Sequence, residues 1–168
     1  MEVNIDQTRF CDRIWAALIF FTRLPFWRLY EPPKESYRTV VEHWPLAGWL
    51  TGAVMAGTLY LSALVTSMPI AVLAAIGARL LVTGALHEDG LADFFDGFGG
   101  GSSRQRILDI MKDSHIGTYG VIGLTVYLLL LLFSLSELGP KTGALAILAA
   151  DPYSKMLASQ LEIGRAHV

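Results

Sequence analysis

The chain is organised around an uncharged stretch, PLAGWLTGAVMAGTLYLSALVTSMPIAVLAAIGA, at residues 45–78. A helix needs about 20 apolar residues to cross a lipid bilayer, and this stretch supplies most of two such helices. Met68 and Pro69 interrupt it near the middle, where the chain is expected to turn. The stretch therefore predicts one membrane span at 46–67 and a second, shorter span at 70–86, which carries Arg79.

The composition of the whole chain supports this interpretation. Apolar residues make up 53% of the 168 residues, charged residues make up 17%, and the mean hydropathy is +0.46, values that are unusual for a soluble protein. The lipid bilayer is therefore an expected partner. The formal net charge of -2 argues against nucleic-acid binding. The single cysteine, Cys11, excludes a disulfide within the chain.

Two further apolar stretches lie nearer the C-terminus. Residues 116–136 carry no charged side chain and predict a third span. Residues 143–150 begin a fourth apolar segment, but Asp151, Pro152 and Lys155 interrupt it, so the fourth span stays open. The segment 14–27 is too short to cross and is expected at the membrane interface. We expect an all-α, polytopic protein of three to four transmembrane helices, with a single membrane-embedded domain at 1–160 and an atypical tail at 161–168.

The basic residues predict how the spans are oriented. Residues 1–44 contain six Lys and Arg residues and the loop 87–115 contains three, whereas the turn at residues 68–69 contains none. Loops on the cytoplasmic side of a membrane are enriched in these residues. The N-terminus and the loop 87–115 are therefore expected in the cytoplasm. The N-terminus lacks the features of a cleaved secretory signal.

The loop 87–115 opens with a concentration of negative charge, HEDGLADFFDGFGGGSSRQR at residues 87–106. Asp89, Asp93 and Asp96 are spaced i, i+4 and i+7, so a helix would place all three on one side. Carboxylates at this spacing repel one another, and a divalent cation would offset the repulsion. Mg²⁺ fits because it prefers oxygen ligands and is commonly held by a few carboxylates together with substrate phosphates. The alternative is a solvated polar loop, although such a loop would not require this regular spacing.

The residues that follow offer ligands for a phosphorylated molecule. Gly97 leaves the backbone of the acidic stretch accessible. The run GGGSSRQR at 99–106 then supplies backbone N–H groups, hydroxyls and the guanidinium groups of Arg104 and Arg106, with a plain flexible linker as the alternative. Lys112 and Asp113 lie side by side before the span at 116–136. They are either a phosphate ligand with a metal or base partner, or an interfacial charge pair.

Several motifs occur in an order that resembles one family. TGALHEDGLADFFDGFGG at residues 83–100 and LDIMKDSHIGTYGVIGL at residues 108–124 closely resemble two elements of the cobalamin synthase family, the adenosylcobinamide-GDP ribazoletransferases. FFTRLPFW at residues 20–27 is similar to the N-terminal motif of that family, and HWPLAGWLTGA at residues 43–53 is similar to its first span. The similarity is spread over about residues 14–160.

The resemblance implies a multi-pass enzyme of the bacterial inner membrane that needs Mg²⁺. In this family a ribose hydroxyl of α-ribazole, or of its 5′-phosphate, displaces GMP from the diphosphate of adenosylcobinamide-GDP. The product is adenosylcobalamin or its 5′-phosphate, and the reaction is the last step of nucleotide-loop assembly in cobalamin biosynthesis. By position, the acidic motif implies Asp89, Asp93 and Asp96 as ligands of Mg²⁺. Other enzymes of the pathway or a second copy of the chain are further candidate partners.

Other residues are candidates for roles in this reaction, and among them Lys112, Asp113 and Ser114 match the second motif of the family by position. The residues expected to bind substrate are Arg104, Arg106, Lys112, Ser114 and Gly97. One carboxylate, Asp96 or Asp113, is expected to accept the proton of the attacking hydroxyl. His87 is either a second base or a hydrogen-bonded structural residue.

The chain departs from the family pattern in two ways. Glu88 stands where the family usually has an apolar residue, and it either enriches the metal site or places a charge at the interface without a catalytic purpose. Family members also continue through further spans, which implies a C-terminally truncated member and leaves open whether this chain is active alone. Arg79 lies within a predicted span and is expected to form an ion pair in the protein interior.

Two other classes of function fit the sequence less well. A CDP-alcohol phosphotransferase-like lipid enzyme also uses clustered aspartates and Mg²⁺, but its motif has an arginine after the alanine, where this chain has Asp93 after Ala92. A membrane cation carrier would place carboxylates near the middle of its spans. The span predicted at 116–136 contains none.

Overall fold

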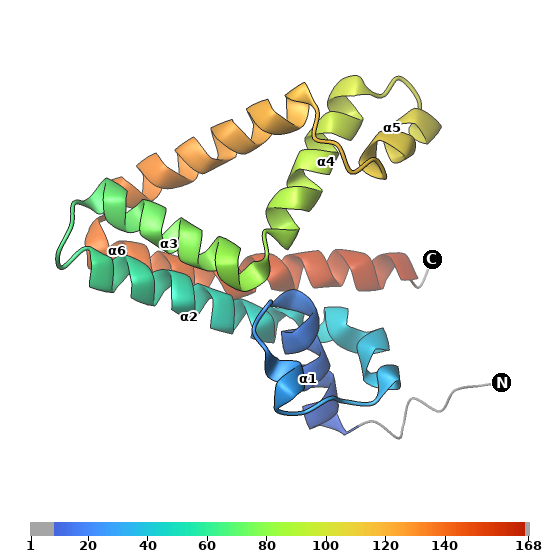
Figure 1. Ribbon diagram of the computed structural model, residues 1–168, viewed down its shortest axis with the longest axis horizontal. Helices are drawn as coiled ribbons and strands as arrows, with labels where there is room; N and C mark the ends of the chain where they lie inside the picture. Colours follow the sequence, from blue (N-terminus) through green and yellow to red (C-terminus); the bar gives the residue numbers. More distant parts are fainter. Residues whose placement is uncertain (1–8, 167–168) are drawn as a thin grey trace.

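The computed structural model of the protein describes residues 9–166, with side chains as far as residue 162. All regular elements in this range are helices, so the all-α prediction is confirmed (Figure 1). They are α1 (Phe10–Phe21), the 3-10 helices η2 (Phe26–Arg28) and η3 (Lys34–His43), α2 (Trp44–Ser62), α3 (Met68–Thr83), α4 (Leu86–Gly100), α5 (Arg104–Met111) and α6 (Thr118–Ala166). Of the tail predicted at 161–168, residues 167–168 lie outside the described range, and the backbone before them is helical.

The first two predicted spans correspond to α2 and α3. The turn between them occupies residues 63–67, earlier than predicted, because Pro69 lies in the first turn of α3. A proline is tolerated there, since the first N–H groups of a helix have no partner within the helix. Side chains of α2 and α3 pack with Leu135 and Ile147 of α6 in the larger hydrophobic core. A smaller core joins α1, η3 and the start of α2, where the rings of Phe21 and Trp44 stack at a centroid distance of 4.8 Å.

A sharp bend separates α3 from the acidic helix α4. The two helices meet at an angle of 93°. Gly84 and Ala85 connect them, and both have the left-handed backbone conformation, with φ of 66° and 58°. Glycine adopts this conformation readily, whereas a side chain makes it costly. The acidic stretch is therefore a separate helix that leads away from the end of α3 at a steep angle, as Figure 1 shows.

Replacing Gly84 with alanine is expected to destabilise the protein by about 1–2 kcal/mol or more, because of the left-handed conformation and because a Cβ atom at this position would overlap the side chain of Arg23. Gly77 is the matched control. It lies within α3, a Cβ atom there would meet no neighbour within 4 Å, and alanine is the better helix former by about 1 kcal/mol. Thermal unfolding in detergent should show a lower melting temperature for Gly84→Ala and an equal or higher one for Gly77→Ala. A wild-type melting temperature for Gly84→Ala would contradict the bend.

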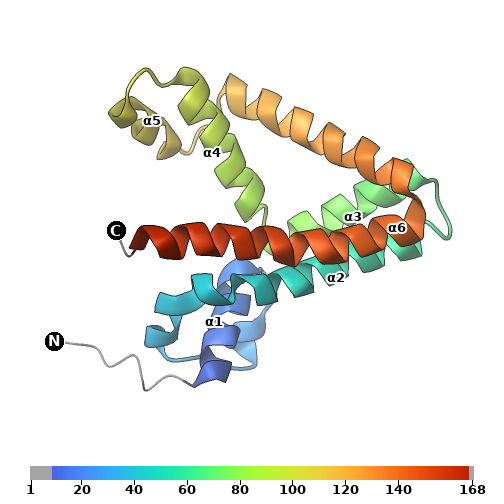
Figure 2. The ribbon, with the colours of Figure 1, turned by 180° about the vertical axis from the view of Figure 1, so that it is seen from behind.

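Helix α6 consists of two arms that run in different directions (Figure 2). The first arm, residues 118–138, matches the third predicted span. The chain reverses at Gly139, which has φ of 72° and precedes Pro140. The second arm, residues 140–166, stays helical through Asp151, Pro152 and Lys155, so these residues do not end the apolar segment that begins at 143. The second arm approaches α2 closely at Gly48. A Cβ atom on this residue would lie only 2.7 Å from the Cα atom of Pro152, so a larger side chain would not fit there.

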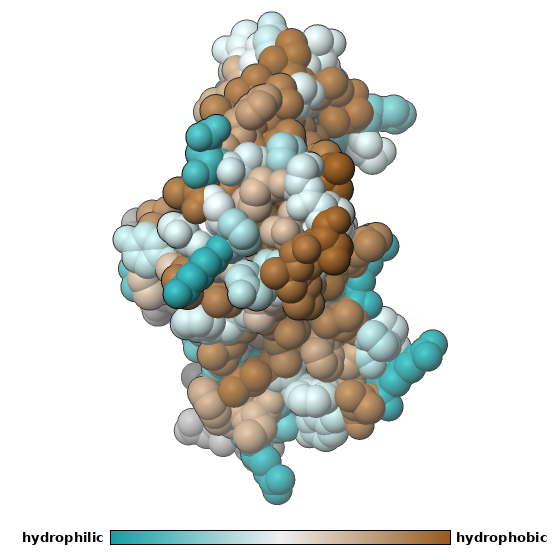
Figure 3. Space-filling model, turned by 90° about the vertical axis from the view of Figure 1, so that its left-hand side faces the viewer, coloured by the Kyte–Doolittle hydropathy of each residue, from teal (hydrophilic) through white to brown (hydrophobic). Residues whose placement is uncertain are grey.

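The outer surface of the helices is strongly apolar. Figure 3 shows hydrophobic side chains over much of the end of the molecule that carries the α2–α3 turn. In the described part of the chain, the helical run Thr118–Glu162 is the one helix that is long and apolar enough to cross a membrane, and 11% of its most apolar window is buried. The bent pair of α3 and α4 passes the same test as a unit. The number of three to four spans stays a prediction.

Candidate functional site

Helix α4 separates its four carboxylates into an inner pair and an outer pair. Glu88 and Asp96 are buried, with 6% and 7% of their surface exposed. Asp89 is exposed and Asp93 is partly exposed. The inner pair contacts the rest of the protein, whereas the outer pair is accessible to a ligand.

Asp96 binds the beginning of α6. Its two carboxylate oxygens accept hydrogen bonds from the backbone N–H groups of Gly117, at 2.7 Å, and Gly120, at 2.8 Å. Free N–H groups at the start of a helix are favourable partners for a negative charge. These contacts account for the burial of Asp96 and fasten α6 to α4, a role that the sequence did not predict.

The outer pair lines a pocket between α4 and the segment that follows α5. This pocket, which we call the acidic pocket, has a volume of about 380 Å³. Five of the predicted site residues line it: Asp89, Asp93, Lys112, Asp113 and Ser114. The structure therefore brings together two carboxylates of the first motif with a cation, a carboxylate and a hydroxyl of the second motif.

A second pocket of about 460 Å³ adjoins the acidic pocket, and Asp113 and Ile116 line both. Arg106, His115 and Asp96 also line this second pocket. Both pockets are lined by the segment that follows α5. A molecule with several phosphate groups could therefore contact the cations Lys112 and Arg106 as well as the carboxylates of the acidic pocket.

The charges of the site shift the pKa values of its residues. Partial burial, together with the negative charges of Asp89 and Asp96, raises the pKa of Asp93 above its ordinary value. Asp113 accepts hydrogen bonds from the backbone N–H of His115, at 3.1 Å, and is 2.6 Å from its Nδ1 atom. This contact lowers the pKa of Asp113 and raises the pKa of His115. A positive charge on the imidazole is thus favoured beside Asp113.

The pKa of His115 is expected to exceed its ordinary value of 6.5. Because the folded protein raises this pKa, the contact stabilises the fold fully below pH 6.5 and is lost as the pH rises through the raised pKa. The lowered pKa of Asp113 works in the opposite direction, so the contact weakens again as the pH falls below 3.8. An NMR titration of the His115 ring should give a midpoint above 6.5, and Asp113→Asn should return it toward that value. A midpoint that Asp113→Asn does not move would contradict the contact.

The donor set of the acidic pocket fits Mg²⁺ with two protein carboxylates. No three His, Cys, Asp or Glu side chains of the described residues are grouped closely enough to form a metal site by themselves, so the assignment of Asp89, Asp93 and Asp96 as ligands stays a prediction. Mg²⁺ does not require such a group, because it usually keeps several waters and binds one or two carboxylates together with substrate phosphates. Asp89 and Asp93 meet this requirement, and their mutual repulsion would be relieved by a cation.

Three predicted residues lie away from both pockets. Gly97 is buried against α5, where a Cβ atom would lie 2.7 Å from the Cγ atom of Met111, so it allows helix packing rather than access for a ligand. Arg104 is exposed at the start of α5. His87 lies against the Trp44 ring, at a centroid distance of 5.6 Å, and its buried ring nitrogens have no hydrogen-bond partner among the residues that the structure describes. His87 therefore does not form the hydrogen bond proposed for its structural role.

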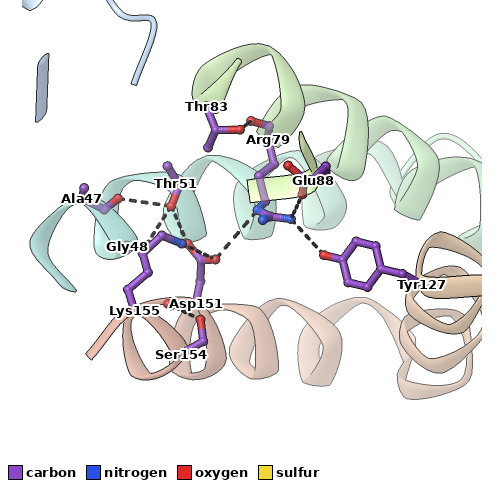
Figure 4. Close-up of polar contacts among 10 residues, drawn as sticks. All are labelled: Ala47, Gly48, Thr51, Arg79, Thr83, Glu88, Tyr127, Asp151, Ser154 and Lys155. Carbon is purple, nitrogen blue, oxygen red and sulfur yellow. Dashed lines mark hydrogen bonds and ion pairs between the residues drawn. The ribbon is translucent and has the colours of Figure 1, made fainter. Parts of the chain in front are cut away.

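A buried network of charged residues lies beneath α4 (Figure 4). Arg79 of α3 contacts Glu88, with 2.9 Å between Nη1 and Oε1, and its Nε atom is 3.8 Å from Asp151. Nη1 also donates a hydrogen bond to the hydroxyl of Tyr127 at 3.3 Å. Asp151 in turn binds Lys155 at 2.8 Å and accepts a hydrogen bond from the hydroxyl of Thr51. Four helices thus meet in this network.

The network confirms the interior ion pair predicted for Arg79 and explains Glu88. Glu88 is buried and pairs with Arg79, so its charge has a structural partner; it also lines the acidic pocket beside Asp89 and Asp93. Asp151 and Lys155 were not predicted as partners. The sequence does contain a signal for them, because opposite charges lie four residues apart inside an apolar helix. Such charges are costly in an apolar environment unless they are paired.

Comparisons with known proteins place this site in a family. A family model described as cobalamin-5-phosphate synthase matches residues 13–163. The adenosylcobinamide-GDP ribazoletransferase of Shewanella frigidimarina is 37% identical over 171 residues, which cover 100% of this chain and 66% of the relative. The proteins of the same name from Ralstonia nicotianae and Leptothrix cholodnii are 38% and 44% identical, covering 88% and 80% of this chain and 59% and 51% of the relatives.

The comparisons support the first of the three functions weighed from the sequence, although the chain spans only about half to two thirds of the length of these relatives. No solved structure matches the chain. The family model covers both elements that line the acidic pocket, the acidic helix and the segment after α5. On these grounds, the chain belongs to the cobalamin-5-phosphate synthase family.

Proposed function

We propose that this chain carries the phosphoryl-transfer site of an adenosylcobinamide-GDP ribazoletransferase. The observation that supports the proposal most strongly is the acidic pocket, in which Asp89 and Asp93 lie with Lys112, Asp113 and Ser114. The substrates would be adenosylcobinamide-GDP and α-ribazole or its 5′-phosphate, as the name of the relatives suggests. The reaction joins the two and releases GMP.

The residues of the pocket suit the charges of this reaction. Asp89 and Asp93 would hold Mg²⁺, which when bound supplies positive charge to the diphosphate oxygens. Lys112 would balance the remaining phosphate charge, and the hydroxyl of Ser114 would donate a hydrogen bond to a phosphate oxygen. Arg106, in the adjoining pocket, would bind a phosphate group of the same or the second substrate.

Asp113 is the best placed general base. It lines both pockets, whereas both oxygens of the other candidate, Asp96, are engaged by backbone N–H groups. The attacking hydroxyl oxygen would form a bond to the phosphorus attached to cobinamide, the bond from that phosphorus to the GMP oxygen would break, and the hydroxyl proton would pass to Asp113. Lys112 and Arg106 would stabilise the charge that moves onto the leaving GMP.

The protein would carry out this reaction at a membrane. The apolar outer surface of α2, α3 and α6 would contact lipid, consistent with the exposure of Leu81, Leu130 and Phe133 at 80%, 63% and 65%. The basic residues of the N-terminal region and of the loop around α5 would lie on the cytoplasmic side of the bacterial inner membrane. The acidic pocket would then open toward nucleotide substrates in the cytoplasm.

The experiment is an assay of membranes that contain this chain. They are supplied with adenosylcobinamide-GDP, Mg²⁺ and either α-ribazole or its 5′-phosphate, and GMP and the corrinoid product are separated by chromatography. The expected result is one corrinoid product for each GMP released. A second arm uses the chain extended by the C-terminal part of the Shewanella frigidimarina relative. Absence of product in both arms would refute the proposed function.

A further inference from the structure

Helix α4 is held to the rest of the protein by its two buried carboxylates. Near its start, Glu88 binds Arg79 of α3, and near its end, Asp96 binds the first N–H groups of α6. The accessible residues Asp89 and Asp93 lie between these anchors. The link to α3 is a bend at two residues of left-handed conformation, so α4 does not continue the axis of α3 and its other contacts contribute to its direction.

The contacts of Arg79 determine where the first anchor is held. Its guanidinium reaches Glu88 of α4, Tyr127 of the first arm of α6 and Asp151 of the second arm. The side chains of Arg79 and Glu88 are 10% and 8% exposed, so water screens their attraction little. Hydrogen bonds and ion pairs are directional, unlike apolar contacts. The network can therefore define an orientation of α4 that packing alone would leave free.

We propose that Arg79 and Glu88 are positioning residues that fix the orientation of α4 relative to the second arm of α6 and so present Asp89 and Asp93 to the acidic pocket. Glu88 precedes Asp89 directly, and one helical turn separates Asp89 from Asp93. A change in the direction of α4 would move both outer carboxylates relative to Lys112 and Asp113, which follow α5. Neither Arg79 nor Glu88 needs to touch a substrate for this role.

A positioning role of Arg79 and Glu88 can be tested apart from their contribution to the stability of the fold, because replacing one member of a buried ion pair and replacing both have different effects. Removing one charge of a buried pair is strongly destabilising, whereas replacing both members with apolar residues of similar volume is often neutral or stabilising. The double variant Arg79→Met with Glu88→Leu is therefore expected to stay folded while it loses the directional contacts. The single variant Glu88→Gln preserves the shape of the side chain and leaves Asp151 as a partner for Arg79.

Pulsed electron–electron resonance between two spin labels tests the orientation directly. The labels are attached to cysteines at Phe98 of α4 and Tyr153 of α6, which are 61% and 57% exposed, in a background that carries Cys11→Ser, since Cys11 is exposed. We expect a narrow distance distribution for the otherwise unchanged protein. In the double variant the distribution should broaden or shift, while the melting temperature in detergent stays within a few degrees of the parent.

The matched control makes the same two changes at exposed positions of η3, Arg38→Met with Glu42→Leu. Its distance distribution is expected to be unchanged. If the double variant and Glu88→Gln both keep the distribution of the parent, the packing of α4 alone sets its orientation and the proposal is overturned. This measurement needs no substrate or metal, so it does not depend on the proposed function.

The consequence for the acidic pocket rests on the proposed function and is measured by Mn²⁺ binding, followed by the electron paramagnetic resonance signal of free Mn²⁺. Changes in groups that orient metal ligands typically weaken metal binding about 10–100-fold. We expect a loss in this range for Arg79→Lys, which keeps the positive charge but loses the multiple contacts of the guanidinium, at a residue that lines a different pocket. Asp93→Asn is the reference variant. Wild-type Mn²⁺ affinity in Asp93→Asn would refute the metal site, whereas a loss in Asp93→Asn without one in Arg79→Lys would overturn the positioning role.

Discussion

Replacing Asp93 with asparagine is expected to lower the rate of GMP release by about 100-fold or more, since a bound metal ion contributes several kcal/mol to the stabilisation of transition-state charge. Asparagine keeps the shape of the side chain but removes the negative charge that would hold Mg²⁺. Because Asp93 is partly exposed, the fold should tolerate the change. The rate is measured at saturating Mg²⁺ in membranes that contain equal amounts of each variant.

The control for this prediction is Glu42→Gln, which removes one negative charge from an exposed position in η3. Its rate should equal that of the unchanged protein. Asp89→Asn should resemble Asp93→Asn, because both side chains line the acidic pocket. A rate for Asp93→Asn close to that of Glu42→Gln would show that this carboxylate does not take part in the reaction.

The second large effect is expected at Asp151, which stabilises the centre of the fold. Lys155 is 3% exposed and binds Asp151, and Arg79 lies 3.8 Å from the same carboxylate oxygen. Removing one partner of a buried ion pair costs about 3–5 kcal/mol, because the other charge stays buried without compensation. Asp151→Asn should therefore lower the free energy of unfolding by several kcal/mol, as measured by thermal or denaturant-induced unfolding in detergent.

A compensating change tests the origin of this loss. Adding Lys155→Met to Asp151→Asn removes the uncompensated charge, so much of the lost stability should return. The exposed variant Glu42→Gln should change the free energy of unfolding by no more than about 0.5 kcal/mol. If Asp151→Asn is as stable as the unchanged protein, Asp151 and Lys155 do not form the buried ion pair that the structure describes.

Hydropathy and spacing were sufficient to predict the helices and part of the site. The absence of charge at 45–78 predicted α2 and α3, and the apolar run at 116–136 predicted the first arm of α6. The spacing of the aspartates correctly placed them on one helix. Lys112 and Asp113 line one pocket with Asp89 and Asp93, and their role there stays a prediction.

The remaining features depend on contacts between distant residues. A pattern of i, i+4 and i+7 defines one side of a helix but does not say which members of it face the protein, and here Asp96 turns inward to the start of α6. Asp151 and Lys155 looked like an interruption of a span because their compensating partner, Arg79, lies on another helix. The left-handed conformation at Ala85 is likewise imposed by tertiary structure, since alanine does not favour it.

The most direct test of the account is the dependence of the transfer reaction on a divalent cation. Membranes that contain the chain, alone and extended by the C-terminal part of a relative, are treated with EDTA and then supplied with Mg²⁺ in increasing amounts. We expect GMP release and corrinoid formation to stop together after EDTA, to return together with Mg²⁺, and to need a higher Mg²⁺ concentration in Asp89→Asn. Transfer that continues after complete removal of the metal would contradict this dependence.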